Sequence, residues 1–324
     1  MNLIFSYIVI LKHMATATSS AVDPVEIPGR PLFVWVEWPE IYTAREWRSF
    51  FDQLLGFSLT NRGNFVTSHI VIRVMNPQWE GLFPVSPDSA FYTDFLARLP
   101  EGIELRIYPY VFTKKYQRKW AAYSGTGRAL EGVFKYANDW NIMLASMGNA
   151  ARFSAVVLDH EEEHGFIGEQ DRVSTYKEMY GIPILGVALG FDAVSHSHKF
   201  PFANEFYLEM YDFYKVDATD IELVETEPGE GPETFLTRLK RLSLVPSIAR
   251  TYRDPRLHFM WSVQSRTNNC IYPLEGVCGQ KNDFGIFSAP EFNTFLGMVQ
   301  EQIPILSERS HGIFQFCFVP PSWL

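Results

Sequence analysis

Eight short runs of apolar and aromatic residues, spread along the chain after residue 30, constrain its fold more than any other feature of the sequence. Each run is rich in Val, Ile, Phe and Tyr and is bounded by Pro, Gly or Asn, which is the pattern of a buried strand. In chain order the runs begin at Phe33, His69, Ile103, Phe153, Ile182, Glu205, Leu257 and Gly312. The sequence therefore predicts eight strands.

Helical patterns fill most of the gaps between these runs. Thr43 with Glu46 forms a capping box at the start of the first pattern, and Ser86 with Pro87 opens the second. The predicted helices cover residues 43–56, 86–102, 128–146, 173–180, 232–244 and 289–306. Because parallel strands need a crossover connection, this alternation predicts a parallel sheet. Eight such units favour a single (β/α)8 TIM barrel of the α/β class, with an open sheet or two domains as the alternative.

The length of 324 residues suits one barrel domain over residues 25–324. Residues 1–24 are predicted to be a signal peptide or a disordered leader, because Leu3–Leu11 is apolar and Ala15–Ala17 follows as a small-x-small cleavage pattern. These features predict a secreted or lumenal protein with no membrane anchor in the mature chain. If Met14 is the true start, the protein is instead cytoplasmic.

Composition and charge disfavour several classes of partner. The net charge of −9 and the pI near 5.4 argue against binding to nucleic acid or to an anionic membrane surface. No GxGxxG or GxxxxGK[ST] motif follows the first run, so a nucleotide-binding sheet is not favoured. The three cysteines lack the CxxC spacing of a structural zinc site. The sequence does not determine the oligomeric state.

In a barrel of this kind the active site lies at the carboxyl ends of the strands. Those ends are predicted to carry Glu37, Trp38, Asn76, Tyr108, Tyr110, Asp159, Glu161, Glu163, Asp192, Glu209, Tyr211, Asp212, Trp261, Gln264 and Gln315. This set is acidic and aromatic and contains no Lys or Arg, which disfavours phosphate esters as substrates. Flat rings stack on the apolar faces of sugars, so Trp38, Tyr110 and Trp261, together with Glu209, are predicted to bind a carbohydrate substrate.

The fourth run carries the most informative carboxylates. Side chains alternate along a strand, so Asp159 and Glu161 are expected to share the inward face with Val157. Two carboxylates held this close cannot both ionise freely, and one pKa of the pair is pushed upward. A protonated carboxyl beside a carboxylate is what glycosidic cleavage requires. The alternative is that these residues form a solvated acidic loop.

Here the sequence resembles the chitinase-type barrels of glycoside hydrolase family 18, whose fourth strand ends in D-x-x-D-x-D-x-E. On this chain Glu161 takes the position of the acid, and Asp159 that of the residue that assists the substrate's N-acetyl group. Tyr211 and Asp212 stand where that family has a Tyr-Asp pair on its sixth strand. The segment from Asp159 to Glu162 is also similar to the D-x-E-E of the hyaluronidases. The resemblance implies a glycosidase that acts without a cofactor on a carbohydrate, including those that contain N-acetylhexosamine.

The chain departs from that family at several positions. The two earlier acidic positions of the motif are occupied by Ser154 and Val157. The third run reads IYPYV instead of Ser-x-Gly-Gly, and the eighth lacks the Trp at the floor of the family's site. These departures leave open a non-catalytic, carbohydrate-binding barrel.

The same segment supports a second kind of enzyme. His160, Glu161 and His164 satisfy the H-E-x-x-H pattern of zinc peptidases. That pattern needs a helix, which places both histidines on one face as zinc ligands. The apolar residues 156–158 before it and Gly165 after it favour a strand that ends in a loop. A zinc metallopeptidase, with zinc as its cofactor, is therefore the alternative function.

Overall fold

The computed structural model describes residues 30–37, 43–45, 47, 48, 51, 65–74, 82, 84–111, 114–159, 168–190, 200–209, 253–263, 286, 287, 301 and 310–316. The strands of this part of the chain are β1 (Arg30–Glu37), β2 (Phe65–Val74), β3 (Glu104–Pro109), β4 (Arg152–Asp159), β5 (Ile184–Gly190), β6 (Glu205–Glu209), β7 (Leu257–Val263), β8 (Ile286–Phe287) and β9 (Ser310–Phe316). All eight predicted runs contain a strand, and the two-residue β8 is an addition.

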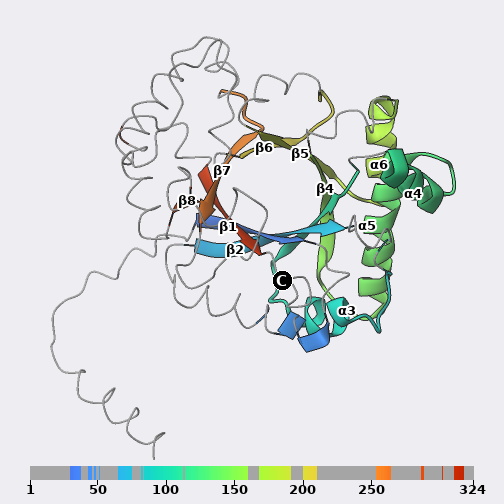
Figure 1. Cartoon of the computed structure of the whole chain (residues 1–324), viewed down its shortest axis with the longest axis horizontal. Coiled ribbons are helices and arrows are strands. Elements are labelled where there is room, and N and C mark those ends of the chain that lie inside the picture. The colour runs from blue at the N-terminus through green and yellow to red at the C-terminus, as the bar shows by residue number, and fades with distance from the viewer. Residues whose placement is uncertain are drawn as a thin grey trace, which may run out of the picture.

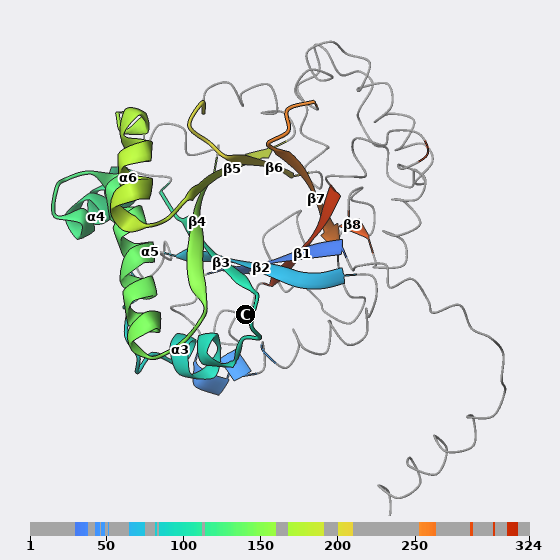
Figure 2. The same ribbon diagram turned by 180° about the vertical axis from the view of Figure 1, so that it is seen from behind.

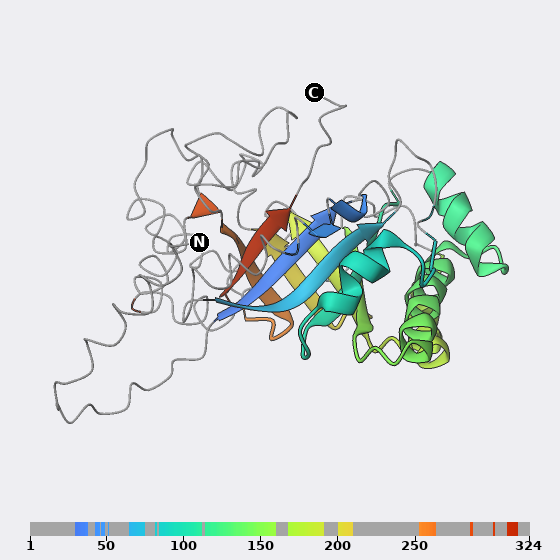
Figure 3. The same ribbon diagram turned by 90° about the horizontal axis from the view of Figure 1, so that it is seen from below.

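The described strand pairs are all parallel. The strand order is β6-β5-β4-β3-β2-β1-β9-β7-β8, and β6 also pairs with β7. The pairing therefore returns from β7 to β6, while β8 is attached to β7 beside this ring. Figure 1 shows the ring of strands face on, and Figure 3 shows from below how the strands slant across it. The predicted parallel α/β architecture is confirmed, in a TIM-barrel-like arrangement.

The helices of the described part lie outside the ring, on the side of β3 and β4 (Figures 1 and 2). They are α3 (Ala90–Asp94), α4 (Lys114–Ser124), α5 (Ala129–Ser146) and α6 (Val173–Tyr180), with 3-10 turns at η2 (Leu96–Arg98) and η4 (Gln170–Arg172). A glycine allows α4 and α5 to approach closely, since a Cβ on Gly132 would lie 2.0 Å from the carbonyl oxygen of Trp120.

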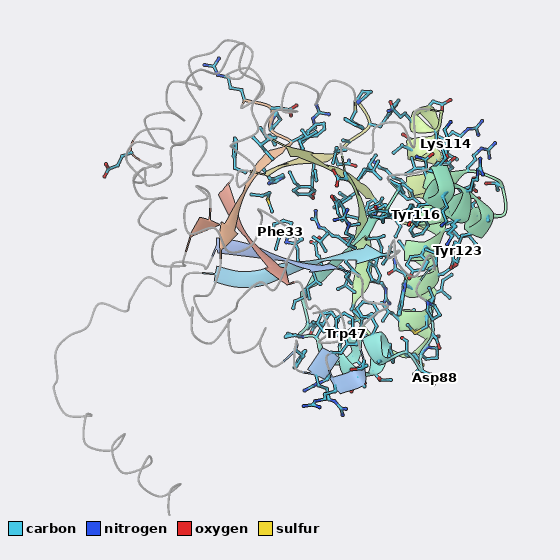
Figure 4. The ribbon with its side chains drawn as sticks, viewed as in Figure 1. Phe33, Trp47, Asp88, Lys114, Tyr116 and Tyr123 are labelled. Carbon is cyan, nitrogen blue, oxygen red and sulfur yellow. The ribbon has the colours of Figure 1, made fainter. Side chains whose placement is uncertain are left out.

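Two apolar clusters lie on opposite faces of the strands. The inner cluster fills the ring with Phe33, Val71, Tyr108, Val157, Ala188, Tyr207 and Met260, and Figure 4 shows Phe33 inside the ring. The outer cluster lies between strands and helices and includes the fully buried Trp47, Trp120 and Trp140. Alternate residues of a strand thus serve the two faces, as the pleat requires.

The predicted helices at residues 128–146 and 173–180 correspond to α5 and α6 and are confirmed. The first predicted helix is confirmed where it is described: residues 44, 45, 47, 48 and 51 are helical, and the Trp47 amide donates to the Thr43 carbonyl at 3.0 Å. The remaining predicted helices, at residues 232–244 and 289–306, lie outside the described residues except for residue 301, which is helical.

Two helix assignments differ from the prediction. Ser89, not Ser86, caps α3: its hydroxyl accepts from the Tyr92 amide at 3.2 Å, because residues 86–89 form a turn in which Ser89 Oγ donates to the Ser86 carbonyl. Helix α4 was not predicted, since its sequence KKYQRKWAAYS is mostly polar and its buried residues are Tyr116 and Trp120. Their i, i+4 spacing is the signal that could have found it.

The predicted leader over residues 1–24 lies outside the described residues. Of the helices that the structure describes, none combines the length and the apolar character needed to cross a membrane.

Candidate functional site

Asp159 is the last residue of β4 and lies at the carboxyl-end opening of the ring. Val157, two residues earlier, belongs to the inner apolar cluster, and the backbone of Asp159 pairs with Ala188 of β5. Asp159 therefore lies on the same inward face as Val157, whereas Glu161, the other carboxylate predicted on this face, lies outside the described residues. The Asp159 side chain is half-buried, so it combines a fixed backbone with partial access to solvent.

Tyr108 of β3 holds the Asp159 carboxylate from the neighbouring strand. Its hydroxyl donates to Asp159 Oδ2 at 2.5 Å, and its side chain is 3% exposed within the inner cluster. The register pairs Ile107 with Val156, so the Tyr108 ring rises from the level of Val157 to reach Asp159. The long aromatic side chain thus bridges the two strands just inside the opening.

Arg73 of β2 lies beside Tyr108 in the strand register and adds a third strand to this group. Its guanidinium lies 5.1 Å from the centroid of the Tyr108 ring and 5.3 Å from that of Tyr110. The prediction that the opening carries no Lys or Arg is therefore wrong. Among the described residues of β2, which ends at Val74, Arg73 is the inward position nearest the opening, whereas the predicted end at Asn76 lies outside the described residues. We call Arg73, Tyr108 and Asp159 the upper cluster.

Tyr110, predicted to bind substrate, follows β3 and is half-buried. Its ring packs edge-on against Tyr116 of α4 at 4.9 Å, and its carbonyl accepts from Trp120 Nε1 at 3.1 Å. The ring is thus fixed between the Arg73 guanidinium and α4, and its role toward substrate stays a prediction.

The other predicted site residues are not placed by their side chains. Glu209 ends β6 and Trp261 lies in β7, and for both residues only the backbone is described. The remaining ones, Trp38, His160, Glu161, His164, Tyr211 and Asp212, lie outside the described residues. Within the described residues, no three His, Cys, Asp or Glu side chains converge on a position for a metal ion.

Glu169, ten residues beyond Asp159, fixes the chain that follows β4 to helix α5. Its carboxylate accepts from the backbone amides of Leu130 and Glu131 at 3.2 and 3.3 Å, and from the Tyr176 hydroxyl at 3.1 Å. A carboxylate at a helix amino terminus satisfies free amides and the helix dipole together. Burial raises the pKa of Tyr176, with a further contribution from Glu169. Glu169 thus joins the amino terminus of α5 to Tyr176 of α6.

A second polar group, the lower cluster, lies inside the ring near the amino-terminal ends of β3, β6 and β7. It consists of His69, Glu104, Arg106, Glu205, Tyr207 and His258. Arg106 is 3% exposed, and its Nη1 donates to Glu205 Oε2 at 2.7 Å and to the Tyr207 hydroxyl, which in turn donates to Glu205. Burial raises the pKa of Glu205, and the cation of Arg106 opposes that rise.

Burial favours the neutral form of His69 in the lower cluster. Its ring stacks on Phe33 at 4.1 Å with an interplanar angle of 5°. Burial lowers the pKa of His69 to about 3, and Arg106 and His258 contribute in the same direction. Its Nε2 lies 3.4 Å from Glu104 Oε2, but the Glu104 side chain is 48% exposed, so that contact is weakened by water and burial decides the outcome.

Sequence reasoning missed Arg73 and the whole lower cluster. Arg73 and the lower cluster could have been found from polar residues that lie on one face of an apolar run, two or four positions apart. The segments His69-Ile70-Val71-Ile72-Arg73 and Glu104-Leu105-Arg106-Ile107 show this pattern. In a strand buried on both faces, such residues must meet partners across the interior.

In comparisons with solved structures, the chain is similar to the catalytic domain of a hyperthermophilic chitinase from Pyrococcus furiosus, at 10% identity and a TM-score of 0.45, over 88% of this chain and 84% of that one. It is also similar to a family GH18 chitinase from Cycas revoluta in a complex with allosamidin, at 13% identity and a TM-score of 0.41, over 87% and 94% of the two chains. The same Cycas chitinase in complex with (GlcNAc)3 gives 13% identity and a TM-score of 0.40, over 87% and 94%.

No protein-family model matches the chain, and no curated protein matches its sequence. The structural neighbours named above are chitinases.

Proposed function

We propose that the chain is a single (β/α)8 barrel that binds a carbohydrate at the carboxyl ends of its strands and hydrolyses a glycosidic bond there. The proposal rests on the position of Asp159. Its carboxylate lies on the inward face at the carboxyl end of β4 and accepts a hydrogen bond from Tyr108. The ring of parallel strands, with helices after β2, β3 and β4, supports the barrel. Saccharides that contain N-acetylhexosamine belong to the proposed substrate class.

In the proposed reaction two carboxyl groups have different roles. Glu161, two residues beyond Asp159, donates a proton to the leaving oxygen of the glycosidic bond, and Asp159 orients the reacting group and stabilises the positive charge that develops on the sugar. Water completes the cleavage. Tyr211 and Asp212 contact the substrate near the reaction centre.

The remaining contacts hold the saccharide in place. Trp38, Tyr110 and Trp261 stack on the apolar faces of the sugar rings, and Glu209 binds sugar hydroxyls. This chemistry uses no metal ion and no organic cofactor. The alternatives are a zinc peptidase that binds metal through His160 and His164, and a carbohydrate-binding barrel without catalysis.

The proposal is tested by replacing the acid. In Glu161→Gln, hydrolysis of chito-oligosaccharides, followed by the release of reducing ends, should fall by roughly three orders of magnitude or more, because the amide keeps the shape and loses the proton. Glu178→Gln, which changes an exposed residue of α6 in the same way, should keep the wild-type rate. Activity that survives in Glu161→Gln contradicts the assignment of the acid.

Two further measurements separate the alternatives. Treatment with EDTA should leave the hydrolysis unchanged, whereas a zinc peptidase would lose its metal and its activity. A carbohydrate-binding barrel would change its tryptophan fluorescence with oligosaccharides and release no reducing ends. If neither binding nor hydrolysis occurs with any saccharide, the proposed function is wrong.

A further inference from the structure

The inference concerns the orientation of the Asp159 carboxylate. A carboxylate at the end of a strand rotates easily about its last side-chain bond, because that torsion has broad minima. Val157, the preceding inward residue of β4, is apolar and offers no hydrogen bond. The hydrogen bond of 2.5 Å from the Tyr108 hydroxyl to Asp159 therefore comes from the neighbouring strand, β3.

The residues around Tyr108 hold its ring in a fixed position. Its ring is 3% exposed and belongs to the inner cluster with Phe33 and Val71. The Arg73 guanidinium lies 5.1 Å from its centroid, close enough for a favourable cation–π interaction. A donor whose ring is packed on several sides gives its acceptor one orientation at little further entropic cost.

We propose that Tyr108 is a positioning residue that holds Asp159 in the orientation needed for glycosidic cleavage. The inference rests on the proposed function of Asp159. Tyr108 does not touch the substrate in this account; it acts through the Asp159 carboxylate. A displacement of a reacting group by about 1 Å can lower a rate by roughly a hundredfold, which sets the scale of the expected effect.

The chain contains a matched control for this contact. Tyr123 of α4 donates to Asp139 Oδ2 of α5 at 2.7 Å, so it is the same pair of residue types on the outer helices. Figure 4 shows Tyr123 among the helices, outside the ring of strands that surrounds Phe33. Tyr123→Phe removes a tyrosine–aspartate hydrogen bond without touching the ring interior.

The experiment measures the hydrolysis of chito-oligosaccharides by the wild type, Tyr108→Phe and Tyr123→Phe at several pH values. In Tyr108→Phe we expect kcat to fall roughly 10- to 100-fold while KM changes less than about threefold. Tyr123→Phe should match the wild type in kcat, KM and pH profile.

A conservative replacement protects the test against a purely steric effect. Incorporation of 3-fluorotyrosine at position 108 keeps both ring and hydroxyl, and it should restore kcat to within about threefold of the wild type. Failure of this rescue, or an unchanged kcat in Tyr108→Phe, overturns the positioning role while the proposed function stands. A wild-type protein that hydrolyses no saccharide overturns the proposed function and the positioning role together.

Discussion

The two ends of the ring interior satisfy their charged groups in different ways. In the lower cluster Arg106 is 3% exposed and meets the carboxylate of Glu205 at 2.7 Å, with the Tyr207 hydroxyl between the two side chains. In the upper cluster Asp159 is half-buried, and one of its contacts is the hydrogen bond that it accepts from the hydroxyl of Tyr108.

This difference fits the proposed function, in which the upper cluster lies at the substrate site and the lower cluster supports the fold. A buried ion pair that loses one partner leaves a charge in a poor solvent, so the lower cluster cannot change without destabilising the fold. A carboxylate that is only half-buried can exchange contacts with a ligand. In (β/α)8 barrels the carboxyl-end face carries function and the opposite face carries stability, and the proposed function assigns the upper cluster to the carboxyl-end face.

The largest expected loss of stability follows from a substitution in the lower cluster. Arg106→Met leaves the half-buried Glu205 without its cation, and the free energy of unfolding should fall by roughly 3–5 kcal/mol. Arg48→Met is the control, because the Arg48 side chain is 57% exposed in its 3.6 Å pair with Asp94 and its loss should cost less than about 1 kcal/mol. Urea unfolding measures both variants. Equal losses would remove the distinction between buried and exposed pairs on which the comparison depends.

A tyrosine-to-phenylalanine substitution in each cluster compares the two clusters directly. Tyr207→Phe removes the hydroxyl between Arg106 and Glu205 and should lower the free energy of unfolding by roughly 1–3 kcal/mol. Tyr108→Phe should lower it by about 1 kcal/mol or less, because water reaches the half-buried Asp159 and replaces the lost donor. The same urea titrations test this order, and a larger loss in Tyr108→Phe than in Tyr207→Phe would reverse it.

The smallest expected effect depends on pH. Unfolded His69 takes up a proton below its ordinary pKa of 6.5, whereas folded His69 does so only near its lowered pKa of about 3. The unfolded state therefore binds more protons in this window, and the stability due to neutral His69 is complete above pH 6.5 and is lost as the pH falls toward 3.

His69→Gln isolates this contribution, since glutamine does not titrate. Between pH 6.5 and 5.5 the free energy of unfolding of the wild type should fall by about 1 kcal/mol more than that of the variant. Glu205 has a raised pKa and contributes with the opposite sign, but it is present in both proteins and cancels. Parallel pH dependence in the two proteins would show that His69 is not held neutral.

The strands and the position of Asp159 could be predicted because both depend on local pattern. An apolar run flanked by turn residues specifies a strand, and the end of such a run specifies where a carboxylate emerges. The Arg73 position could not be predicted, because it required the end of β2 to within two residues, and boundaries are the least certain part of a pattern.

The lower cluster could not be predicted for a different reason. Arg106 meets Glu205 across 99 positions of sequence and Tyr207 across 101, so no window of sequence contains both partners. Polar residues at alternate positions show that a strand needs partners, and only the closed pairing of strands identifies them. Helix α4 was missed because two buried rings on a polar segment are a weak pattern.

On the inner face of β5, the size of residue 186 is limited by the neighbouring side chain of Tyr207. A Cβ on Gly186 would lie 2.5 Å from Cε2 of Tyr207, so the ring of Tyr207 occupies the space that a larger residue at 186 would need. The same ring carries the hydroxyl that serves Arg106 and Glu205. A larger residue at position 186 would therefore force the Tyr207 ring to move, and this movement would take the hydroxyl away from Arg106 and Glu205. The space left by a glycine on β5 thus holds a buried contact between β3 and β6 in place.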